Sequence, residues 1–312
     1  MRPLASNAAI LFLCSTLACG ETEADGQPDL PSDVRGVHSK AASDDSSRFV
    51  PWAGVDGVQA EIDRLRAAGG GEIRFAPGEY ALETALRIEE AKDIRISGDP
   101  DAVLCFPPAS GTRPVLAEPV VNGDMSLELD GLAPGALVVG RPYQLYPADL
   151  EGGRLLEFEV AAIDGSTVTL RKPARAIGQR ESLPAGSVLF PELNLFRVWR
   201  SDGITIENLV LDGRGRARGD VVGHTTFCGV YATGNPGSPA FQRSRGLRIR
   251  GCTLRAFTGR AFCAYRMDEV LVESCTVRDI VAEGIELDHF TSGRVVGCTI
   301  DGARAGVCLL YT

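Results

Sequence analysis

The sequence predicts an all-β fold in which the chain winds as a solenoid of stacked parallel strands. Three observations support this prediction. The last third of the chain repeats with a period of 23 residues, as the spacing of Cys252, Cys275 and Cys298 shows, and within each repeat apolar residues alternate with polar ones. An amphipathic segment followed by three glycines at 69–71 precedes the first strand-like runs. A fixed period is typical of stacked units that bury one continuous core.

Composition places the chain among soluble globular proteins and excludes one class of partner. Of its 312 residues, 44% are hydrophobic and 23% are charged, which is ordinary for one or two domains. The formal charge of -9 argues against binding to nucleic acid, because phosphate contacts need a basic surface. Anionic sugars are not excluded, since a local group of arginines can bind them.

The first residues predict export. Residues 1–19 read as a signal peptide, since the apolar stretch at 8–17 is shorter than the roughly 20 residues of a membrane-spanning helix. The segment TLAC that ends at Cys19 is similar to the bacterial lipobox, which implies lipid attachment at Cys19 and a cell-surface or periplasmic lipoprotein held at the outer membrane. A plain secreted protein is the alternative. Residues 20–48 have few apolar side chains and predict a flexible tether.

Residues 49–312 form the predicted solenoid domain. Val58, Ile62 and Leu65 give the stripe of a short helix that ends at the glycines, and strands are expected within 72–80, 85–88, 93–98 and 102–106. The period is lost at about 107–193. Strand-like runs joined by Asp164 and Gly165 predict a β-rich insertion in that interval.

The repeats align two sets of strands. The first set lies at 204–211, 247–254, 270–277 and 293–300, and the second at 229–232, 261–264, 284–287 and 306–309. In the second set one inward column is expected to hold Val230, Phe262, Ile285 and Val307. Cys252, Cys275 and Cys298 occupy one inward column of the first set. We expect them to form a buried ladder of thiols, because parallel Cβ directions in stacked coils do not suit a disulfide.

These features resemble the right-handed parallel β-helix of the pectate-lyase-like superfamily. The resemblance covers about 50–106, including the segment FAPGEY at 75–80, and about 197–312. It implies coils that rise by one strand spacing, about 4.8 Å, an N-terminal helix that caps the core, and a polysaccharide as substrate or ligand.

Stacking predicts a candidate site. With Ile285 and Leu287 inward, Glu286 and Asp288 point outward beside His289, and the matching outward positions one and two coils below include Tyr265 and Tyr231. The expected catalytic residues are Glu286, Asp288, His289 and Tyr265, and the expected substrate-binding residues are Tyr231, His224, Arg214 and Arg216.

This set of side chains suits uronic-acid chemistry. An arginine neutralises the sugar carboxylate, a His or Tyr takes the C5 proton, and another group protonates the leaving oxygen. The segment GIELDHF at 284–290 is similar to the YG[FI]DPH segment of mannuronan epimerases, with Glu286 at the acid and His289 near the histidine. Ala303 and Arg304 stand where polygalacturonases have paired aspartates, which argues against hydrolysis of that type. A lyase or C5-epimerase is therefore the leading prediction.

Three alternatives stay open at this point. The same face can belong to a non-catalytic surface protein that binds glycans or mediates adhesion. Its outward acids can be solvated residues that discourage edge pairing. By resemblance to pectate lyases, Glu283, Glu286 and Asp288 can bind Ca²⁺; no other cofactor is expected, and the protein is expected to be a monomer.

Overall fold

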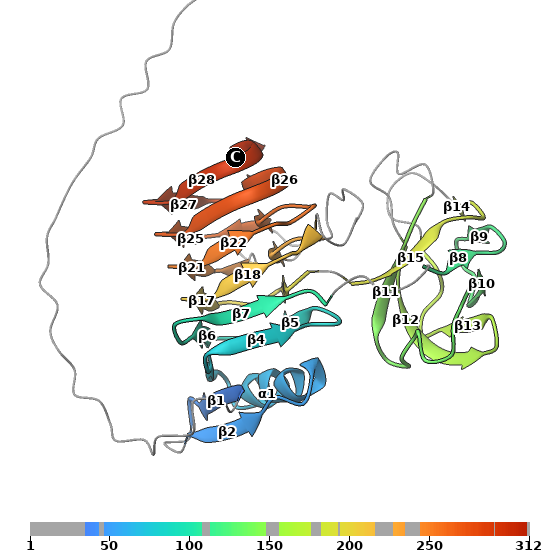
Figure 1. Cartoon of the computed structure of the whole chain (residues 1–312), viewed down its shortest axis with the longest axis horizontal. Helices are drawn as coiled ribbons and strands as arrows, with labels where there is room; N and C mark the ends of the chain where they lie inside the picture. Colours follow the sequence, from blue (N-terminus) through green and yellow to red (C-terminus); the bar gives the residue numbers. More distant parts are fainter. Residues whose placement is uncertain are drawn as a thin grey trace, which may run out of the picture. The chain divides into compact units, whose positions relative to one another are not determined.

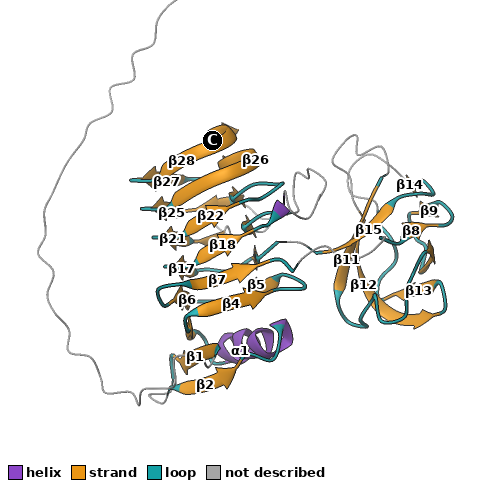
Figure 2. Cartoon of the chain, in the orientation of Figure 1, coloured by secondary structure: helices purple, strands orange, loops and turns teal. Residues whose placement is uncertain are grey.

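The computed structural model describes residues 35–43, 47–107, 113–147, 156–175, 182–192, 194–215, 227–234, 244–289 and 291–310. Figure 1 shows a stack of parallel strands with an inserted β-structure, and Figure 2 shows that strands dominate the described chain. The prediction of an all-β parallel β-helix is confirmed. Cys19, Arg216 and His224 lie outside the described residues.

Each complete coil contributes one strand to each of three parallel sheet faces. The first face contains β3 (Gly71–Phe75), β6 (Ile94–Gly98), β17 (Thr205–Glu207), β21 (Arg248–Arg250), β25 (Val270–Glu273) and β27 (Gly293–Val296). The second contains β4 (Gly78–Ala81), β7 (Ala102–Cys105), β18 (Val210–Asp212), β22 (Thr253–Arg255) and the first parts of β26 (Thr276–Asp288) and β28 (Thr299–Leu310). The third contains β5 (Leu86–Glu89), β16 (Phe196–Trp199), β19 (Val230–Thr233), β23 (Phe262–Tyr265) and the last parts of β26 and β28. A short parallel pair, β20 (Ser244–Arg245) with β24 (Met267–Asp268), lies outside these faces.

The eight-residue stretches of the repeat are not single strands. Each bends at one residue with a positive φ: Asn208 (55°), Gly251 (57°), Ser274 (53°) and Gly297 (61°). A left-handed residue turns the chain sharply, so each stretch gives one strand to the first face and one to the second. The alternation of apolar residues shifts by one place at the bend: Ile206 is followed inward by Leu209, with Glu207 and Asn208 between them.

A helix and two strands cover the N-terminal end of the stack. Helix α1 (Val55–Ala67) buries Val58, Ile62 and Leu65, as its apolar stripe predicts. The tether prediction is wrong for part of 20–48, because β1 (Gly36–Ala41) pairs antiparallel with β3 and with β2 (Arg48–Pro51). The pairing occupies an edge of β3 that would otherwise be open. It also requires Gly71, since a Cβ there would collide with the carbonyl of Lys40.

The core of the β-helix is continuous from α1 to Leu287. Within it Cys252 and Cys275 are buried and Cys298 is partly buried, and all three are free thiols. Their Sγ atoms contact the carbonyl oxygens of Ile206 (3.7 Å), Ile249 (3.6 Å) and Val272 (3.6 Å), each on the coil below. The predicted ladder of buried thiols is therefore present.

The insertion is a closed barrel with a hydrophobic core of its own. Its strands, in order around the barrel, are β10 (Ser126–Asp130), β13 (Thr167–Leu170), β12 (Leu156–Asp164), β11 (Pro142–Tyr146), β15 (Val188–Pro191) and β8 (Val115–Leu116). A separate antiparallel pair is formed by β9 (Val120–Val121) and β14 (Ser182–Leu183). Tyr146 and Phe190 pack against Phe227, which precedes β19, with ring centroids 6.1 and 5.4 Å away. This aromatic contact joins barrel strands to the core of the β-helix.

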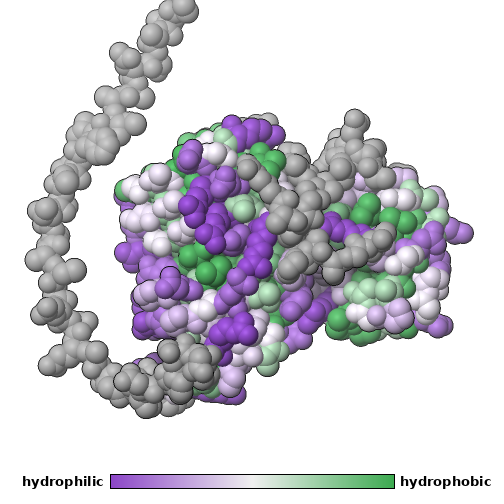
Figure 3. All heavy atoms as spheres, in the orientation of Figure 1, coloured by the Kyte–Doolittle hydropathy of each residue, from purple (hydrophilic) through white to green (hydrophobic). Residues whose placement is uncertain are grey.

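Apolar and hydrophilic residues are interspersed on the surface seen in Figure 3. Within the described part of the chain, no helix has the length and apolar character needed to cross a membrane.

Candidate functional site

The third sheet face presents two outward columns of side chains. Strand register places Arg87, Arg197, Tyr231, Cys263, Glu286 and Cys308 in one column, and Glu89, Trp199, Thr233, Tyr265 and Asp288 in the other. We call this surface the β5–β28 face. The vertical neighbours predicted for Glu286 and Asp288 are the ones observed.

Glu286 lies at the centre of a buried cluster near the upper end of this face. It is 1% exposed. The phenol of Tyr265 donates a hydrogen bond of 2.6 Å to it, and Nε of Arg260 lies 2.7 Å from the same carboxylate oxygen. Burial raises the pKa of Glu286, and the contacts with Tyr265 and Arg260 offset this only in part. Burial also raises the pKa of the Tyr265 phenol, which therefore holds its proton.

Arg260 is shared with a second carboxylate. Its Nε lies 3.0 Å from Glu283, which also pairs with Arg304. Burial alone would raise the pKa of Glu283, but the hydrogen bond from Arg304 and the charge of Arg260 lower it below its ordinary value. The two glutamates on Arg260 thus have pKa values shifted in opposite directions.

The expected calcium ligands do not fit a metal ion. Glu283 and Glu286 both face the guanidinium of Arg260, so a calcium ion would have to displace this buried cation. Among the described residues there is no group of three or more His, Cys, Asp and Glu side chains arranged to hold a metal.

Asp288 and His289 form a polar pair beside Tyr265. Nδ1 of His289 lies 2.8 Å from Asp288, whose other oxygen accepts the backbone N–H of His289 at 2.6 Å. Asp288 is buried, whereas the His289 side chain is 47% exposed. The His289 and Tyr265 rings meet edge to face with centroids 5.4 Å apart. Holding Nδ1 on Asp288 turns the Nε2 end of the imidazole away from the sheet.

A third set of stacked positions lies at the turn after these strands. Glu90, Arg200, Arg266 and His289 share a left-handed conformation, with φ between 48° and 55°. The backbone N–H of Arg266 bonds to the carbonyl of Asp288 at 3.4 Å, so Arg266 stands one coil below His289. Among the described residues the half-buried Arg266 has no ion pair.

The other predicted site residues lie in different places. Tyr231 is on the face, with its ring centroid 5.8 Å from that of Tyr265, but it is only partly exposed and burial raises its pKa. Arg214 is not part of the cluster: it pairs with Glu79 of β4 on the second sheet face. The reason is that it follows β18, so its backbone has not yet turned towards the third face. Cys263 is outward in register, as expected, yet completely buried, with its Sγ 3.9 Å from that of Cys228.

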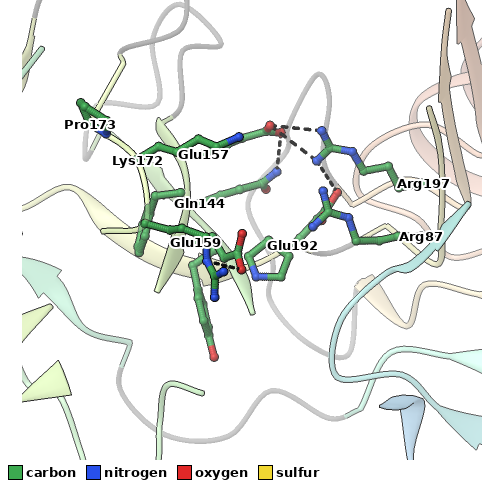
Figure 4. A pocket seen from close by; sticks show the side chains of 12 residues that line it. Arg87, Gln144, Glu157, Glu159, Lys172, Pro173, Glu192 and Arg197 are labelled. Atoms are coloured by element: carbon green, nitrogen blue, oxygen red, sulfur yellow. Dashed lines mark hydrogen bonds and ion pairs between the residues drawn. The ribbon is translucent and has the colours of Figure 1, made fainter. Parts of the chain in front are cut away.

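Several charged residues that the sequence analysis missed line a pocket at the lower end of the face. The pocket has a volume of about 170 Å³. Figure 4 shows Arg87 and Arg197 extending from strands of the β-helix towards Gln144 and Glu157 of the barrel. Arg197 pairs with Glu192 at 2.9 Å and with Glu157 at 3.5 Å. Burial would lower the pKa of Arg197, but these carboxylates outweigh burial and raise it, so the side chain remains charged.

A signal for Arg197 exists in the sequence. In Phe196 to Trp199, as in Val230 to Thr233, inward and outward residues alternate, and Arg197 occupies the position of Tyr231. The signal is hidden because the barrel separates β16 from the rest of its coil. Arg260 gives no such signal, since it lies in a turn where alternation does not fix direction.

Comparison with known proteins gives structural matches only. No protein family matches the sequence, and no curated protein matches it. The tailspike gp61 of Pseudomonas phage phi297 is 16% identical, with 81% of this chain and 59% of that chain covered and a TM-score of 0.23. A glycoside hydrolase is 11% identical, with 81% and 70% covered and a TM-score of 0.38.

The gp54 tailspike of Acinetobacter baumannii bacteriophage AP22, in complex with a capsular saccharide, is 11% identical, with 77% and 55% covered and a TM-score of 0.23. The chain spans 59% of the phi297 tailspike and 42% of gp49 from Pseudomonas phage LKA1. These values are too low to support an argument about function, and the assignment of the fold rests on the strand pairing itself.

Proposed function

We propose that this protein is an exported, polysaccharide-active β-helix protein that removes the C5 proton of a uronic acid residue, as a lyase or C5-epimerase. The single observation behind this proposal is the Asp288–His289 pair, which holds an exposed imidazole beside the phenol of Tyr265. An Asp that holds one nitrogen of a His fixes the orientation of the ring and stabilises its protonated form, which suits the His to act as a general base.

The proposed chemistry assigns one step to each group. Arg266 binds the sugar carboxylate and offsets the charge that develops as C5 loses its proton. His289 takes this proton, and Asp288 stabilises the imidazolium. In a lyase, the electron pair forms the C4–C5 double bond, the C4–O4 bond breaks, and Tyr265 gives its proton to O4. In an epimerase, Tyr265 returns a proton to C5 from the opposite side.

Glu286 and Arg260 position Tyr265, which is the general acid in this scheme. Glu286 is too deeply buried to touch a sugar, but it accepts the hydrogen bond of Tyr265 and is itself anchored by Arg260. Glu286 thereby fixes the orientation of the Tyr265 hydroxyl, and Tyr265 regains its proton from water after the transfer. The role first expected for Glu286 in direct contact with substrate is therefore replaced by a positioning role.

The location and partners follow from the N-terminal sequence. We propose that residues 1–19 direct export and that Cys19 carries a lipid anchor at the outer membrane. A monomer held by this anchor would meet extracellular or periplasmic glycan.

The second candidate is a non-catalytic glycan-binding protein. It is favoured by the pairing of both Glu283 and Glu286 with arginines, which is also what a rigid binding face requires. It predicts binding without release of the C5 proton.

A panel of uronate polymers tests the proposal. Wild-type protein is incubated with alginate, pectate and glycosaminoglycans, and both the absorbance of unsaturated ends and the ratio of C5 epimers by NMR are followed. We expect turnover of at least one polymer and a loss of about 10²- to 10⁴-fold in His289→Gln, the range for one general base.

The matched control is His38→Gln, which changes a histidine of the N-terminal cap whose ring packs at a tilt against Phe49. It is expected to retain wild-type turnover. Binding to a polymer without turnover would support the second candidate, whereas turnover that survives in His289→Gln would refute the assignment of the base.

A further inference from the structure

The pocket between β5, β16 and the barrel contains two buried hydrogen-bond acceptors for which the described residues supply no donor. Gln144 is 1% exposed and donates its amide to Glu157 at 3.1 Å. This bond fixes the amide orientation, so the carbonyl Oε1 faces the other way and has no partner. Glu192 is equally buried: one oxygen accepts from Arg197 and the other, Oε2, has no partner.

Unpaired buried acceptors cost free energy unless a ligand or water supplies donors. Both acceptors belong to residues that line the same pocket of about 170 Å³. These two acceptors therefore lack donors, although charged groups surround them.

All but one of the charged side chains that line the pocket are already paired; the exception among the described residues is the exposed Lys172. Four basic and three acidic side chains line it. Arg197 pairs with Glu192 and Glu157, and Arg171 pairs with Glu159 at 2.8 Å. Arg87 pairs with Glu89 at 2.7 Å. An anionic ligand that bound beside Arg197, away from the exposed Lys172, would have to compete with these carboxylates, whereas hydroxyl groups can donate to Gln144 and Glu192 without disturbing an ion pair.

We infer that this pocket is a binding subsite for an uncharged, hydroxyl-rich sugar residue. Two of its hydroxyls donate to Gln144 Oε1 and Glu192 Oε2. The inference rests on the proposed function only in taking this sugar to belong to the glycan that reaches His289.

The position of the pocket fits an extended ligand. Arg197 and Glu286 are in the same column with Tyr231 and Cys263 between them, which is three strand spacings or roughly 14 Å along the stack. One sugar residue does not span this distance, so an oligosaccharide would occupy both places. Recognition of a neutral residue here would select glycans in which uronic acid alternates with uncharged sugars over a homopolymer of uronate.

Direct binding measurements test the subsite. The probes are methyl glycosides of glucose, galactose and mannose, with sodium glucuronate for comparison, and binding is followed by saturation-transfer NMR. We expect at least one neutral glycoside to bind with a millimolar Kd and to bind more tightly than glucuronate. Gln144→Met, which removes the acceptor at similar size, is expected to weaken binding about tenfold or more.

Glu192→Gln is a second variant, in which a donor can face the sugar in place of the acceptor. Glu128→Gln is the matched control, because Glu128 is a barrel residue that bonds to Ser166 and Thr167 and does not line the pocket. Thermal melting establishes that each variant is folded. Gln144 carries no charge, so its replacement leaves the Arg197 ion pairs in place if Glu192→Gln does not fold.

The outcomes separate the two proposals. If no neutral glycoside binds to wild type, the pocket holds only water. If Gln144→Met binds the glycoside as tightly as wild type does, the sugar binds elsewhere. Either result overturns the inference. Neutral-sugar binding that persists in His289→Gln, with no turnover of any polymer by wild type, would refute the proposed function and leave the subsite standing.

Discussion

In the β-helix each strand pairs in parallel with the strand at the same place in the next coil, whereas each barrel strand pairs antiparallel with its neighbours. The difference decides how side chains become neighbours. Tyr231, Cys263 and Glu286 meet because they have the same position in successive coils. Gln144 and Glu157 meet because β11 and β12 have one particular register in a closed barrel. The cluster around Glu286 is thus determined by the 23-residue repeat, whereas the pocket at Arg197 depends on the strand register of the inserted barrel.

The two buried arginines offer the sharpest comparison between these regions. Arg260→Met leaves Glu283 and Glu286 without their shared cation, and both side chains are less than 10% exposed. We expect the free energy of unfolding to fall by about 3–5 kcal/mol, as for a broken buried ion pair. Urea denaturation at neutral pH measures it.

Arg197→Met is the companion variant. We expect a smaller loss, because Glu157 is 34% exposed and can turn to water even though Glu192 cannot. A loss in Arg197→Met that equals or exceeds that in Arg260→Met would contradict this ranking.

Separate cores predict separate unfolding transitions. Ile249 belongs to the core of the β-helix and Leu145 to that of the barrel, and both are fully buried. Replacing either by Ala is expected to cost about 2–5 kcal/mol in its own region. Hydrogen exchange should show amides of one region losing protection while those of the other keep it. Equal loss in both regions from either variant would mean that the aromatic contact at Phe227 makes them a single cooperative unit.

The opposite pKa shifts of Glu283 and Glu286 predict opposite effects of pH on stability. The lowered pKa of Glu283 contributes stability that is present above its ordinary value of 4.5 and is lost as pH falls through the folded-state pKa. The raised pKa of Glu286 has the reverse sign: its charge costs stability above the folded-state pKa, and this cost is relieved on protonation.

Urea denaturation between neutral pH and pH 3 measures both effects against the matched Glu→Gln variants. On acidification, the advantage of wild type over Glu283→Gln should shrink, and the stability of wild type relative to Glu286→Gln should rise. Parallel trends in the two comparisons would be inconsistent with these shifts.

The smallest expected effect concerns the thiols. Burial raises the pKa of Cys105 to about 11 and strongly raises that of Cys263, so both should resist alkylation in the native state. Among the described cysteines, only Cys298 and Cys308 are partly exposed. Mass spectrometry after brief iodoacetamide treatment should find label at these two first. Early labelling of Cys263 would mean that the β5–β28 face opens readily.

The period explains what the sequence could predict. Cys252, Cys275 and Cys298, and likewise Tyr265 and Asp288, recur at matching places in successive repeats, so their stacking follows from alternation alone. The bends at Asn208 and Ser274 were not predicted, although the apolar alternation shifts by one residue at each of them. Strand β1 was not predicted because its pairing depends on the open edge of β3 and only weakly on its own composition.

The lower pocket could not be derived in this way. Arg197 is separated from its coil by the whole barrel, and its partners Glu157 and Glu192 come from a region without a repeat. Arg214 was misplaced for the opposite reason: proximity in sequence to the stack suggested the third face, whereas its strand belongs to the second.

Release of the C5 hydron into water is common to elimination and epimerisation, and it tests the central assignment most directly. Uronate polymers labelled with tritium at C5 are incubated with wild type, His289→Gln and His38→Gln. We expect wild type and His38→Gln to release the label and His289→Gln to release it about 10²- to 10⁴-fold more slowly. No release by wild type from any polymer, or equal release by His289→Gln, would contradict the assignment of His289 as the base.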